Sequence, residues 1–217
     1  MTAIETPREK FYIHKLFVRV FHWLNAFGMT LMILSGWRIY NASPLFDFKF
    51  PRDYTLGGWL GGALQWHFAA MWLLVINFLI YLIVGFATGH FRRRFTPVSP
   101  ASVLGDMGKA LKRKLPHSTT TYNAVQKASY IGVLLAIVLT IVSGLTVWKP
   151  VQLQEIAILF GGYEGARLVH FFGMAAICAF IVLHLTLVLL VPSTLMPMIV
   201  GWARKGKHEL EAASHEH

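Results

Sequence analysis

The stretch LVHFFGMAAICAFIVLHLTLVLLV, at residues 168–191, decides the fold predicted for this chain. It contains no aspartate, glutamate, lysine or arginine, and its only ionisable side chains apart from one cysteine are two histidines. A bilayer core of about 30 Å needs roughly 20 predominantly apolar residues in a helix. The stretch therefore predicts a transmembrane helix that carries two histidines within the membrane.

Three further stretches have a similar length and apolar character. They cover residues 17–40, 67–88 and 128–148. The composition agrees with this interpretation, since 55% of the 217 residues are hydrophobic and 14% are charged, whereas a soluble domain has about a quarter charged residues. The predicted fold class is all-α: a single integral membrane domain, residues 1–217, in which four helices form a bundle.

Basic residues are concentrated in three of the segments that flank these spans. The N-terminal flank, the loop at residues 89–127 and the tail at residues 192–217 are rich in lysine and arginine, whereas residues 41–66 contain only Lys49 and Arg52. Because cytoplasmic segments carry an excess of basic residues, both termini and the middle loop are expected in the cytoplasm. This rule explains most of the net charge of +10. Membrane lipid, and not nucleic acid, is therefore the expected environment.

Two shorter segments are expected at the membrane surfaces. Residues 56–66 alternate glycine pairs with Trp59, Leu60 and Trp66, which predicts an interfacial loop or short surface helix on the outer side. Residues 195–207 place apolar residues before a basic cluster, which predicts an amphipathic segment on the cytoplasmic surface.

Four of the ten histidines lie at or within the spans: His22, His67, His170 and His184. Ionisable residues inside a membrane are costly and usually mark a functional path. His170 and His184 are 14 residues apart, nearly four helical turns, so they share a face and lie about 21 Å apart along the axis. His67 opens its span on the outer side, level with His170, and His22 lies near the inner start of its span, level with His184.

Two cross-helix histidine pairs at two depths suit two haem irons, each with two axial imidazoles inside an apolar bundle. The prediction is two haem b cofactors between the first, second and fourth helices. His22 and His184 would ligate the iron of the inner haem, and His67 and His170 that of the outer haem. The single cysteine, Cys178, excludes a C-x-x-C-H haem attachment and cysteine-ligated clusters within the chain.

Other interpretations of the histidines remain. A lone histidine is more often a satisfied core residue than a ligand, but four in two depth-matched pairs favour haem ligation. A site of three histidines and a water would need three of them at one depth, which this layout does not offer. A haem-free transporter that uses histidines as a proton relay is a further alternative, and a visible spectrum would distinguish it.

Two glycines occupy positions where a porphyrin would need space. Gly36 lies 14 residues after His22, on the same helix face at the depth of the outer haem, and Gly85 lies 18 residues, or five turns, after His67, facing the inner haem. A residue without Cβ leaves room for a flat macrocycle. The alternative is that both glycines only allow close packing of membrane helices.

Two arginines precede haem-ligand candidates by three residues and so share their helix faces. Arg19 precedes His22, and Arg167 precedes His170. Each arginine is a candidate partner for the propionates of the adjacent haem. Snorkelling to lipid headgroups is the alternative.

Several motifs resemble those of a known group. They are R-V-F-H-W at residues 19–23, W-H-F at 66–68, Y-N-A-V-Q-K at 122–127, and L-V-H at 168–170 with a second histidine 14 residues later. Over residues 15–205 the chain resembles the four-helix cytochrome b subunits of formate dehydrogenase, nickel–iron hydrogenase and thiosulfate reductase, most closely the thiosulfate reductase type.

The resemblance implies the same haem pairs that the depths predict. It also implies a site for quinone, either ubiquinone or menaquinone, beside the inner haem, with Asn123 contributing. From the residues alone, Asn123 would more often be a helix N-cap.

By the same resemblance, the chain would be the electron-transfer subunit of a quinone-linked oxidoreductase complex in the respiratory chain of the bacterial inner membrane. Electrons would pass between quinone and a periplasmic partner, expected to be a molybdopterin oxidoreductase, with an iron–sulfur or cytochrome c subunit as other options. The alternative is a stand-alone haem oxidoreductase that exchanges electrons between quinone and a small diffusible substrate.

Overall fold

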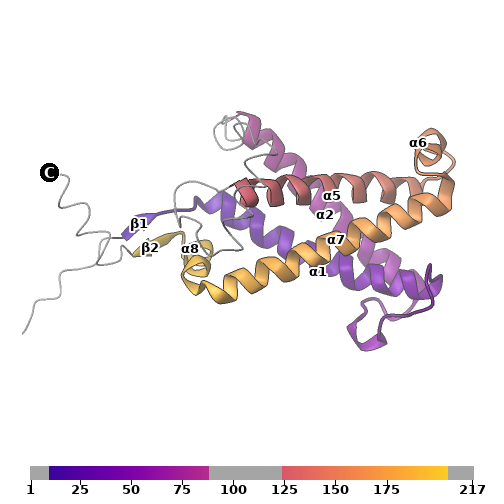
Figure 1. The fold of residues 1–217 in the computed structure, drawn as a ribbon, viewed down its shortest axis with the longest axis horizontal. Helices are drawn as coiled ribbons and strands as arrows, with labels where there is room; N and C mark the ends of the chain where they lie inside the picture. The colour runs from indigo at the N-terminus through magenta and orange to yellow at the C-terminus, as the bar shows by residue number, and fades with distance from the viewer. Residues whose placement is uncertain (1–9, 88–123, 205–217) are drawn as a thin grey trace, which may run out of the picture. The chain divides into compact units, whose positions relative to one another are not determined.

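The computed structural model describes residues 10–87 and 124–204, which are mostly helical (Figure 1). In chain order the elements are β1 (Lys10–Tyr12), α1 (Leu16–Ala42), the 3-10 helix η1 (Arg52–Tyr54), α2 (Leu60–Ala87), α5 (Ala124–Trp148), α6 (Gln154–Leu159), α7 (Gly162–Leu190), the 3-10 helix η2 (Pro192–Thr194), α8 (Leu195–Val200) and β2 (Trp202–Arg204).

Four of these helices are long and apolar enough to cross a membrane, as predicted. The qualifying segments are Leu16–Ala42, Leu60–Ala87, Ile131–Trp148 and Gly162–Leu190. A helix satisfies every backbone hydrogen bond within its own segment, which is why long apolar runs in lipid become helices. The mostly helical fold is therefore confirmed for the described residues, and the assembly of the four helices into one bundle stays a prediction.

The prediction of a separate surface segment at residues 56–66 was wrong in part, because the long helix α2 begins at Leu60 and includes residues 60–66. Gly57 and Gly58 have φ angles of 105° and 69°, a left-handed conformation that glycine adopts at little cost. The chain turns there, and the Ala63 amide then bonds the Trp59 carbonyl at 2.9 Å. The glycine pair is thus the turn into the second long helix.

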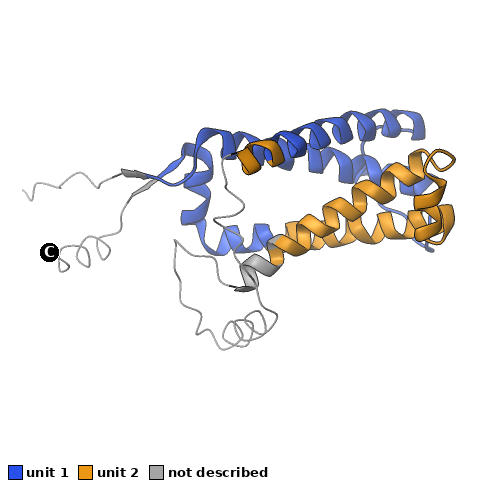
Figure 2. Ribbon diagram, turned by 90° about the horizontal axis from the view of Figure 1, so that it is seen from above, with its two compact units in different colours: residues 1–81, 184–217 blue, residues 82–183 orange. Residues whose placement is uncertain are grey.

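The chain divides into two compact units, coloured separately in Figure 2. Unit 1 comprises Met1–Tyr81 and His184–His217, and unit 2 comprises Leu82–Leu183.

Within unit 1, α1 and α2 form an antiparallel hairpin. The leucine side chains at positions 73 and 74 lie where a Cβ on Gly28 would point. The Asn77 side chain, only 4% exposed, donates from Nδ2 to the Phe21 carbonyl at 3.2 Å. Interhelical bonds of this kind hold membrane helices together, because a polar group facing lipid would lack partners.

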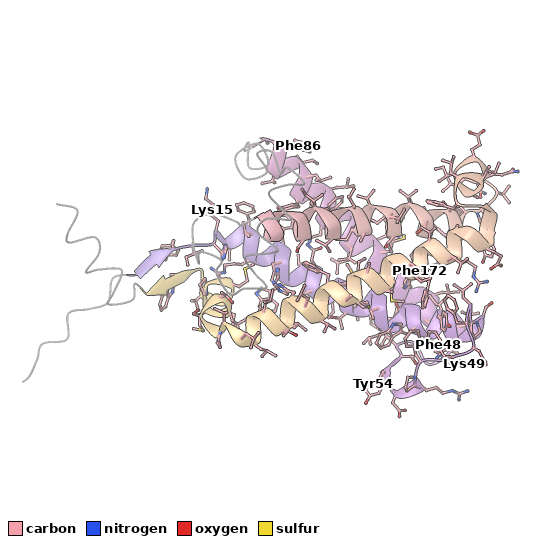
Figure 3. The ribbon with its side chains drawn as sticks, viewed as in Figure 1. Lys15, Phe48, Lys49, Tyr54, Phe86 and Phe172 are labelled. Carbon is pink, nitrogen blue, oxygen red and sulfur yellow. The ribbon has the colours of Figure 1, made fainter. Side chains whose placement is uncertain are left out.

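The aromatic residues of unit 1 cluster where α1 ends. Trp37 stacks on Phe50 with ring centroids 4.6 Å apart, and Tyr40 stacks on Phe48 at 5.2 Å. The Asn41 side chain bonds both the carbonyl and the amide of Phe50, at 2.8 and 2.9 Å. Figure 3 shows Phe48, Lys49 and Tyr54 at this end of α1, and Lys15 at the other. The segment between α1 and α2 is therefore tied back to the helix that precedes it.

The predicted amphipathic segment at residues 195–207 is only partly a helix. The helix α8 ends at Val200, and Gly201, whose φ is 89°, follows it. The strand β2 comes next and pairs antiparallel with β1, with Tyr12 opposite Trp202. The backbone amide of Ile13 also bonds the Gly201 carbonyl at 2.9 Å. Pairing with the N-terminal segment supplies the hydrogen bonds that make residues 202–204 extended.

Unit 2 contains α5, α6 and most of α7. Two of its polar residues on α5, Ser143 and Thr146, are fully buried. Their hydroxyls donate to carbonyls one turn earlier, Leu139 at 2.7 Å and Val142 at 2.8 Å. Each hydroxyl proton is therefore satisfied within the helix, which allows a polar side chain at a buried membrane position.

Candidate functional site

The two histidines predicted for the inner haem lie close together in unit 1. His22 is the seventh residue of α1, and His184 lies six residues before the last residue of α7. Their imidazole centroids are 6.1 Å apart, and the ring planes are inclined at 63°. Two helices from opposite ends of the chain thus bring two imidazoles to one place.

This separation fits two axial ligands of one metal ion. Because a metal–nitrogen bond is about 2 Å long, two imidazoles that shared one metal ion would have their ring centres several ångströms apart. The observed 6.1 Å agrees. A neutral imidazole is a usual ligand of haem iron, so His22 and His184 would suit a haem iron by their chemistry, and their separation is compatible with it.

The histidine predicted on the outer side of α2, His67, is seated against α1 within unit 1. Its Nδ1 lies 3.0 Å from the Ser35 hydroxyl, and Ser35 is fully buried. A Cβ on Gly36 would lie 3.4 Å from Cε1 of the ring. Gly36 therefore lies at the outer histidine, as expected from its spacing, and its neighbour is the imidazole itself.

The histidine predicted on the outer side of α7, His170, has an equivalent seat on α5 within unit 2. Its Nδ1 lies 2.9 Å from the Thr140 carbonyl and 3.4 Å from the Ser143 hydroxyl. A Cβ on Gly144 would lie 2.8 Å from Cε1 and 3.0 Å from Nδ1. Because such distances are too short for a real Cβ, the imidazole occupies the space that the missing side chain leaves.

The two arginines predicted as propionate partners make protein contacts. Arg19 donates from Nη2 to the Ile199 carbonyl at 2.7 Å, and its buried Nε has no hydrogen-bond partner among the described residues. Arg167 pairs with Glu164 at 2.9 Å and lies over the Tyr163 ring at 5.9 Å. The contact of Arg19 with α8 was not foreseen. The propionate roles stay predictions.

Within the described part of the chain, the structure gives no contacts that bear on the predicted roles of two further site residues, Gly85 and Asn123. Gly85 is a buried residue of α2, and its role toward the inner haem stays a prediction. Asn123, predicted at the quinone site, lies outside the described residues.

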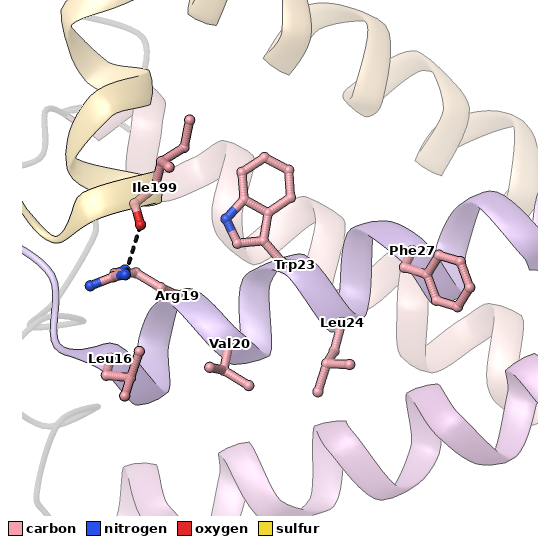
Figure 4. A pocket seen from close by; sticks show the side chains of 7 residues that line it. All are labelled: Leu16, Arg19, Val20, Trp23, Leu24, Phe27 and Ile199. Atoms are coloured by element: carbon pink, nitrogen blue, oxygen red, sulfur yellow. Dashed lines mark hydrogen bonds between the residues drawn. The ribbon is translucent and has the colours of Figure 1, made fainter.

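A shallow groove runs along α1 beside α8 in unit 1 (Figure 4). Arg19 and Trp23 supply its polar atoms, and both direct them to carbonyls of α8, since the Trp23 indole donates to Met198 at 3.1 Å. The remaining lining is apolar, as expected for a surface that faces lipid chains. The lining residues are Leu16, Arg19, Val20, Trp23, Leu24, Phe27 and Ile199.

Sequence reasoning missed the residues on which the outer histidines rest, namely Ser35, Thr140, Ser143 and Gly144. A signal was present, because a Ser-Gly pair interrupts the apolar run of the first span at residues 35–36 and of the third span at residues 143–144. In both spans the pair faces a histidine of another helix in the same unit.

Helices long and apolar enough to span a membrane, with two imidazoles close together, are the features expected of a membrane cytochrome of the b type. The chain belongs to the prokaryotic cytochrome b561 family, whose family model matches residues 13–201.

Curated relatives agree with this family. A protein of Azospira oryzae, named as protein-methionine-sulfoxide reductase subunit YedZ1, is 49% identical over 89% of this chain and 98% of its own length. The formate dehydrogenase cytochrome b556(fdo) subunit of Escherichia coli K12 is 23% identical, over 85% of this chain and 81% of its own length. A protein of Bradyrhizobium diazoefficiens named as a Ni/Fe-hydrogenase B-type cytochrome subunit is 22% identical, over 82% and 77%.

The predicted resemblance to the cytochrome subunits of formate dehydrogenase and hydrogenase is thereby confirmed. The family also establishes the coarse function: a bacterial membrane protein that binds b-type haem and takes part in electron transfer. The finer assignment to the thiosulfate reductase type stays a prediction.

Proposed function

We propose that this chain is the membrane subunit of an oxidoreductase complex, holds two haem b groups, and transfers electrons between quinone and a periplasmic catalytic subunit. The observation that carries the proposal is the 6.1 Å separation of the His22 and His184 imidazoles. Membership of a cytochrome b family argues against the alternative of a haem-free transporter with a histidine proton relay.

In this proposal His22 and His184 hold the inner haem, and His67 and His170 hold the outer one. The pairing of the outer histidines is argued from their predicted depths and from the family resemblance. A haem with two imidazole ligands supplies one-electron transfer between ferric and ferrous iron. The histidines would hold the iron, and the apolar character of the spanning helices would limit solvent access and so influence the redox potential.

The position of the histidines on α7 supports two separate sites. His170 and His184 are 14 residues apart on one continuous helix, which corresponds to about 21 Å along its axis. One iron cannot be reached from both positions. In the proposal the electron path across the membrane therefore passes through two redox centres, and the inner centre lies on the side of both chain termini.

Quinone is proposed to react beside the inner haem, where Asn123 would donate a hydrogen bond to a quinone carbonyl. This residue immediately precedes α5, which begins at Ala124. The basic flanks favour the cytoplasmic face of a bacterial inner membrane for this side, where water could exchange protons with the quinone.

We propose the catalytic partner from the name of the Azospira relative, which includes the words protein-methionine-sulfoxide reductase subunit. Reduction of one methionine sulfoxide to methionine and water consumes two electrons and two protons. Oxidation of one quinol to quinone releases the same numbers. Electrons would then flow from quinol through the membrane subunit to a periplasmic reductase subunit, for which a molybdopterin enzyme remains the expected type.

Anaerobic reduction by a quinol analogue tests the proposal. The wild-type protein should become reduced at both haems, and Asn123→Ala should slow reduction by quinol while reduction by dithionite is unchanged. Purification under mild detergent should recover a larger soluble subunit. Two haems that accept no electrons from any quinol would contradict the quinone role, and a haem protein recovered alone that oxidises quinol with a small sulfoxide would favour the stand-alone alternative.

A further inference from the structure

The same local arrangement occurs in both units around the outer histidines. In unit 1 a Ser-Gly pair of α1 faces His67, and in unit 2 a Ser-Gly pair of α5 faces His170. The two serines, Ser35 and Ser143, are fully buried. Bulk water therefore does not compete for their hydroxyl groups.

The hydroxyl protons of both serines are already used within their helices. Ser35 donates to the Leu31 carbonyl at 2.5 Å, and Ser143 donates to the Leu139 carbonyl at 2.7 Å. A serine hydroxyl has one proton and two acceptor lone pairs. With its proton directed to a carbonyl of its own helix, each serine can act toward an imidazole as an acceptor, and the histidine is then the donor.

For His67 this arrangement favours the tautomer with the proton on Nδ1, which lies 3.0 Å from the Ser35 hydroxyl oxygen. For His170 a backbone contact indicates the same tautomer independently. Its Nδ1 lies 2.9 Å from the Thr140 carbonyl oxygen, which can only accept a hydrogen bond, so Nδ1 is the donor. A neutral imidazole protonated at Nδ1 has its lone pair on Nε2. Both rings are thus set in the tautomer that presents Nε2 to a metal.

The glycines fix where these rings lie. The imidazole of His170 sits so close to Gly144 that a Cβ there would be 2.8 Å from it, and His67 lies 3.4 Å from the Cβ position of Gly36. Each ring therefore rests on bare helix backbone beside its serine. An acceptor on the facing helix favours one tautomer, the Ser35 hydroxyl for His67 and the Thr140 carbonyl with Ser143 for His170, and the glycine sets the distance of the ring from the helix.

We propose that Ser35 and Ser143 are positioning residues for the outer haem, which accept the Nδ1 protons of His67 and His170 and thereby orient Nε2 toward the iron. The inference rests on the proposed function, because it takes these histidines as haem ligands. A hydrogen bond donated from Nδ1 raises the basicity of the ligand. The more basic ligand stabilises ferric iron over ferrous iron and so lowers the midpoint potential of that haem.

The two serines should differ in effect. The Ser35 bond is the shorter, 3.0 Å against 3.4 Å for Ser143. In addition, His170 keeps the Thr140 carbonyl as an acceptor when Ser143 is replaced. Ser35→Ala should therefore change the outer haem more than Ser143→Ala, and Ser35→Thr, which keeps a hydroxyl, should restore much of the wild-type behaviour.

The test is a redox titration of the visible haem bands, with haem content measured on the same samples. Ser35→Ala should weaken outer-haem retention about 10–100-fold and raise the potential of that haem alone. A tenfold preferential loss of ferric affinity corresponds to about 59 mV for one electron. The matched control in the same helix is Thr30→Ala, whose hydroxyl also donates to a carbonyl one turn earlier, at 2.8 Å.

Outcomes separate the inference from the function on which it rests. If Ser35→Ala and Thr30→Ala give the same two potentials, the serine role is wrong while the di-haem function stands. If Ser35→Ala is too unstable to purify, the variants Ser143→Ala and Ser35→Thr decide. The inference would be overturned if Ser143→Ala had the wild-type haem potentials and Ser35→Thr did not retain the outer haem. Loss of no haem from His67→Ala would instead overturn the ligand assignment in the proposed function.

Discussion

Replacement of Gly144 by alanine adds a methyl group directly against the His170 imidazole. The new Cβ would lie 2.8 Å from Cε1, whereas ordinary van der Waals contact begins at 3.4 Å, so the ring must retreat by the difference, about 0.6 Å. The Nδ1 bond to Thr140, now 2.9 Å, would stretch toward 3.5 Å, where a hydrogen bond is largely lost.

The expected cost follows from these two effects. Overpacking of a tight site costs about 1–3 kcal/mol, and an unsatisfied buried donor costs about 1–3 kcal/mol. Together the two effects cost about 2–6 kcal/mol, and since about 1.4 kcal/mol is a factor of ten in an equilibrium constant, retention of the outer haem should fall by roughly one to four orders of magnitude. The inner haem should remain.

The glycines of the two spans provide a graded set of controls. At Gly132, on the same helix α5, a Cβ would meet nothing within 4 Å, and at Gly36 it would lie 3.4 Å from His67. Gly132→Ala should be neutral or slightly stabilising, because alanine favours a helix by up to about 1 kcal/mol over glycine. Gly36→Ala should be intermediate.

The assay is haem per polypeptide by pyridine haemochromogen, together with thermal loss of the visible absorbance. Gly144→Ala should approach one haem per chain, and Gly132→Ala should match wild type. If Gly144→Ala kept both haems with the thermal midpoint of Gly132→Ala, the close seat of His170 on α5 would be wrong.

Three further predictions use the same purified protein. His22→Ala should remove only the inner haem and His67→Ala only the outer, as read from difference spectra, and equal loss of both haems from either variant would contradict separate sites. Arg167→Gln should change the unfolding free energy by less than about 1 kcal/mol, because its partner carboxylate is well exposed. If Arg167 pairs with a haem propionate, loss of its positive charge in Arg167→Gln should lower the midpoint potential of one haem in a redox titration. A potential equal to wild type would exclude that role. Gly201→Ala should cost about 1–2 kcal/mol because its φ is 89°, measured by thermal unfolding; a midpoint equal to wild type would refute the left-handed turn after α8.

The long helices could be predicted because lipid leaves an apolar segment few alternatives. Their ends could not, because they depend on contacts outside the apolar runs. The start of α2 at Leu60 follows from the turn at Gly57 and Gly58, and α7 begins at Gly162, six residues before the predicted start at Leu168. Both helices extend beyond the apolar length that the sequence pattern measures.

The strands β1 and β2 were not foreseen for a different reason. Each has three residues, too few for a recognisable alternation of polar and apolar positions. Their pairing joins residues at opposite ends of the chain, such as Tyr12 and Trp202, and no local pattern announces such a contact.

The candidate site also combines features that the sequence predicted with features that it did not. The spacing of His170 and His184 on one helix is a local property, so the sequence predicted two depths. Which groups seat the rings is a tertiary property, and Ser35 and Gly144 read in the sequence as ordinary small residues of membrane helices. The Ser-Gly pairs acquire meaning only once the facing histidines are placed.

The most direct test of two bis-imidazole haems is a reduced-minus-oxidised visible spectrum of the purified protein, combined with haem stoichiometry on the same sample. We predict sharp b-type bands and two haem b per polypeptide, with two resolvable midpoint potentials. A colourless protein after expression with ample haem, or a single haem per chain, would contradict the account.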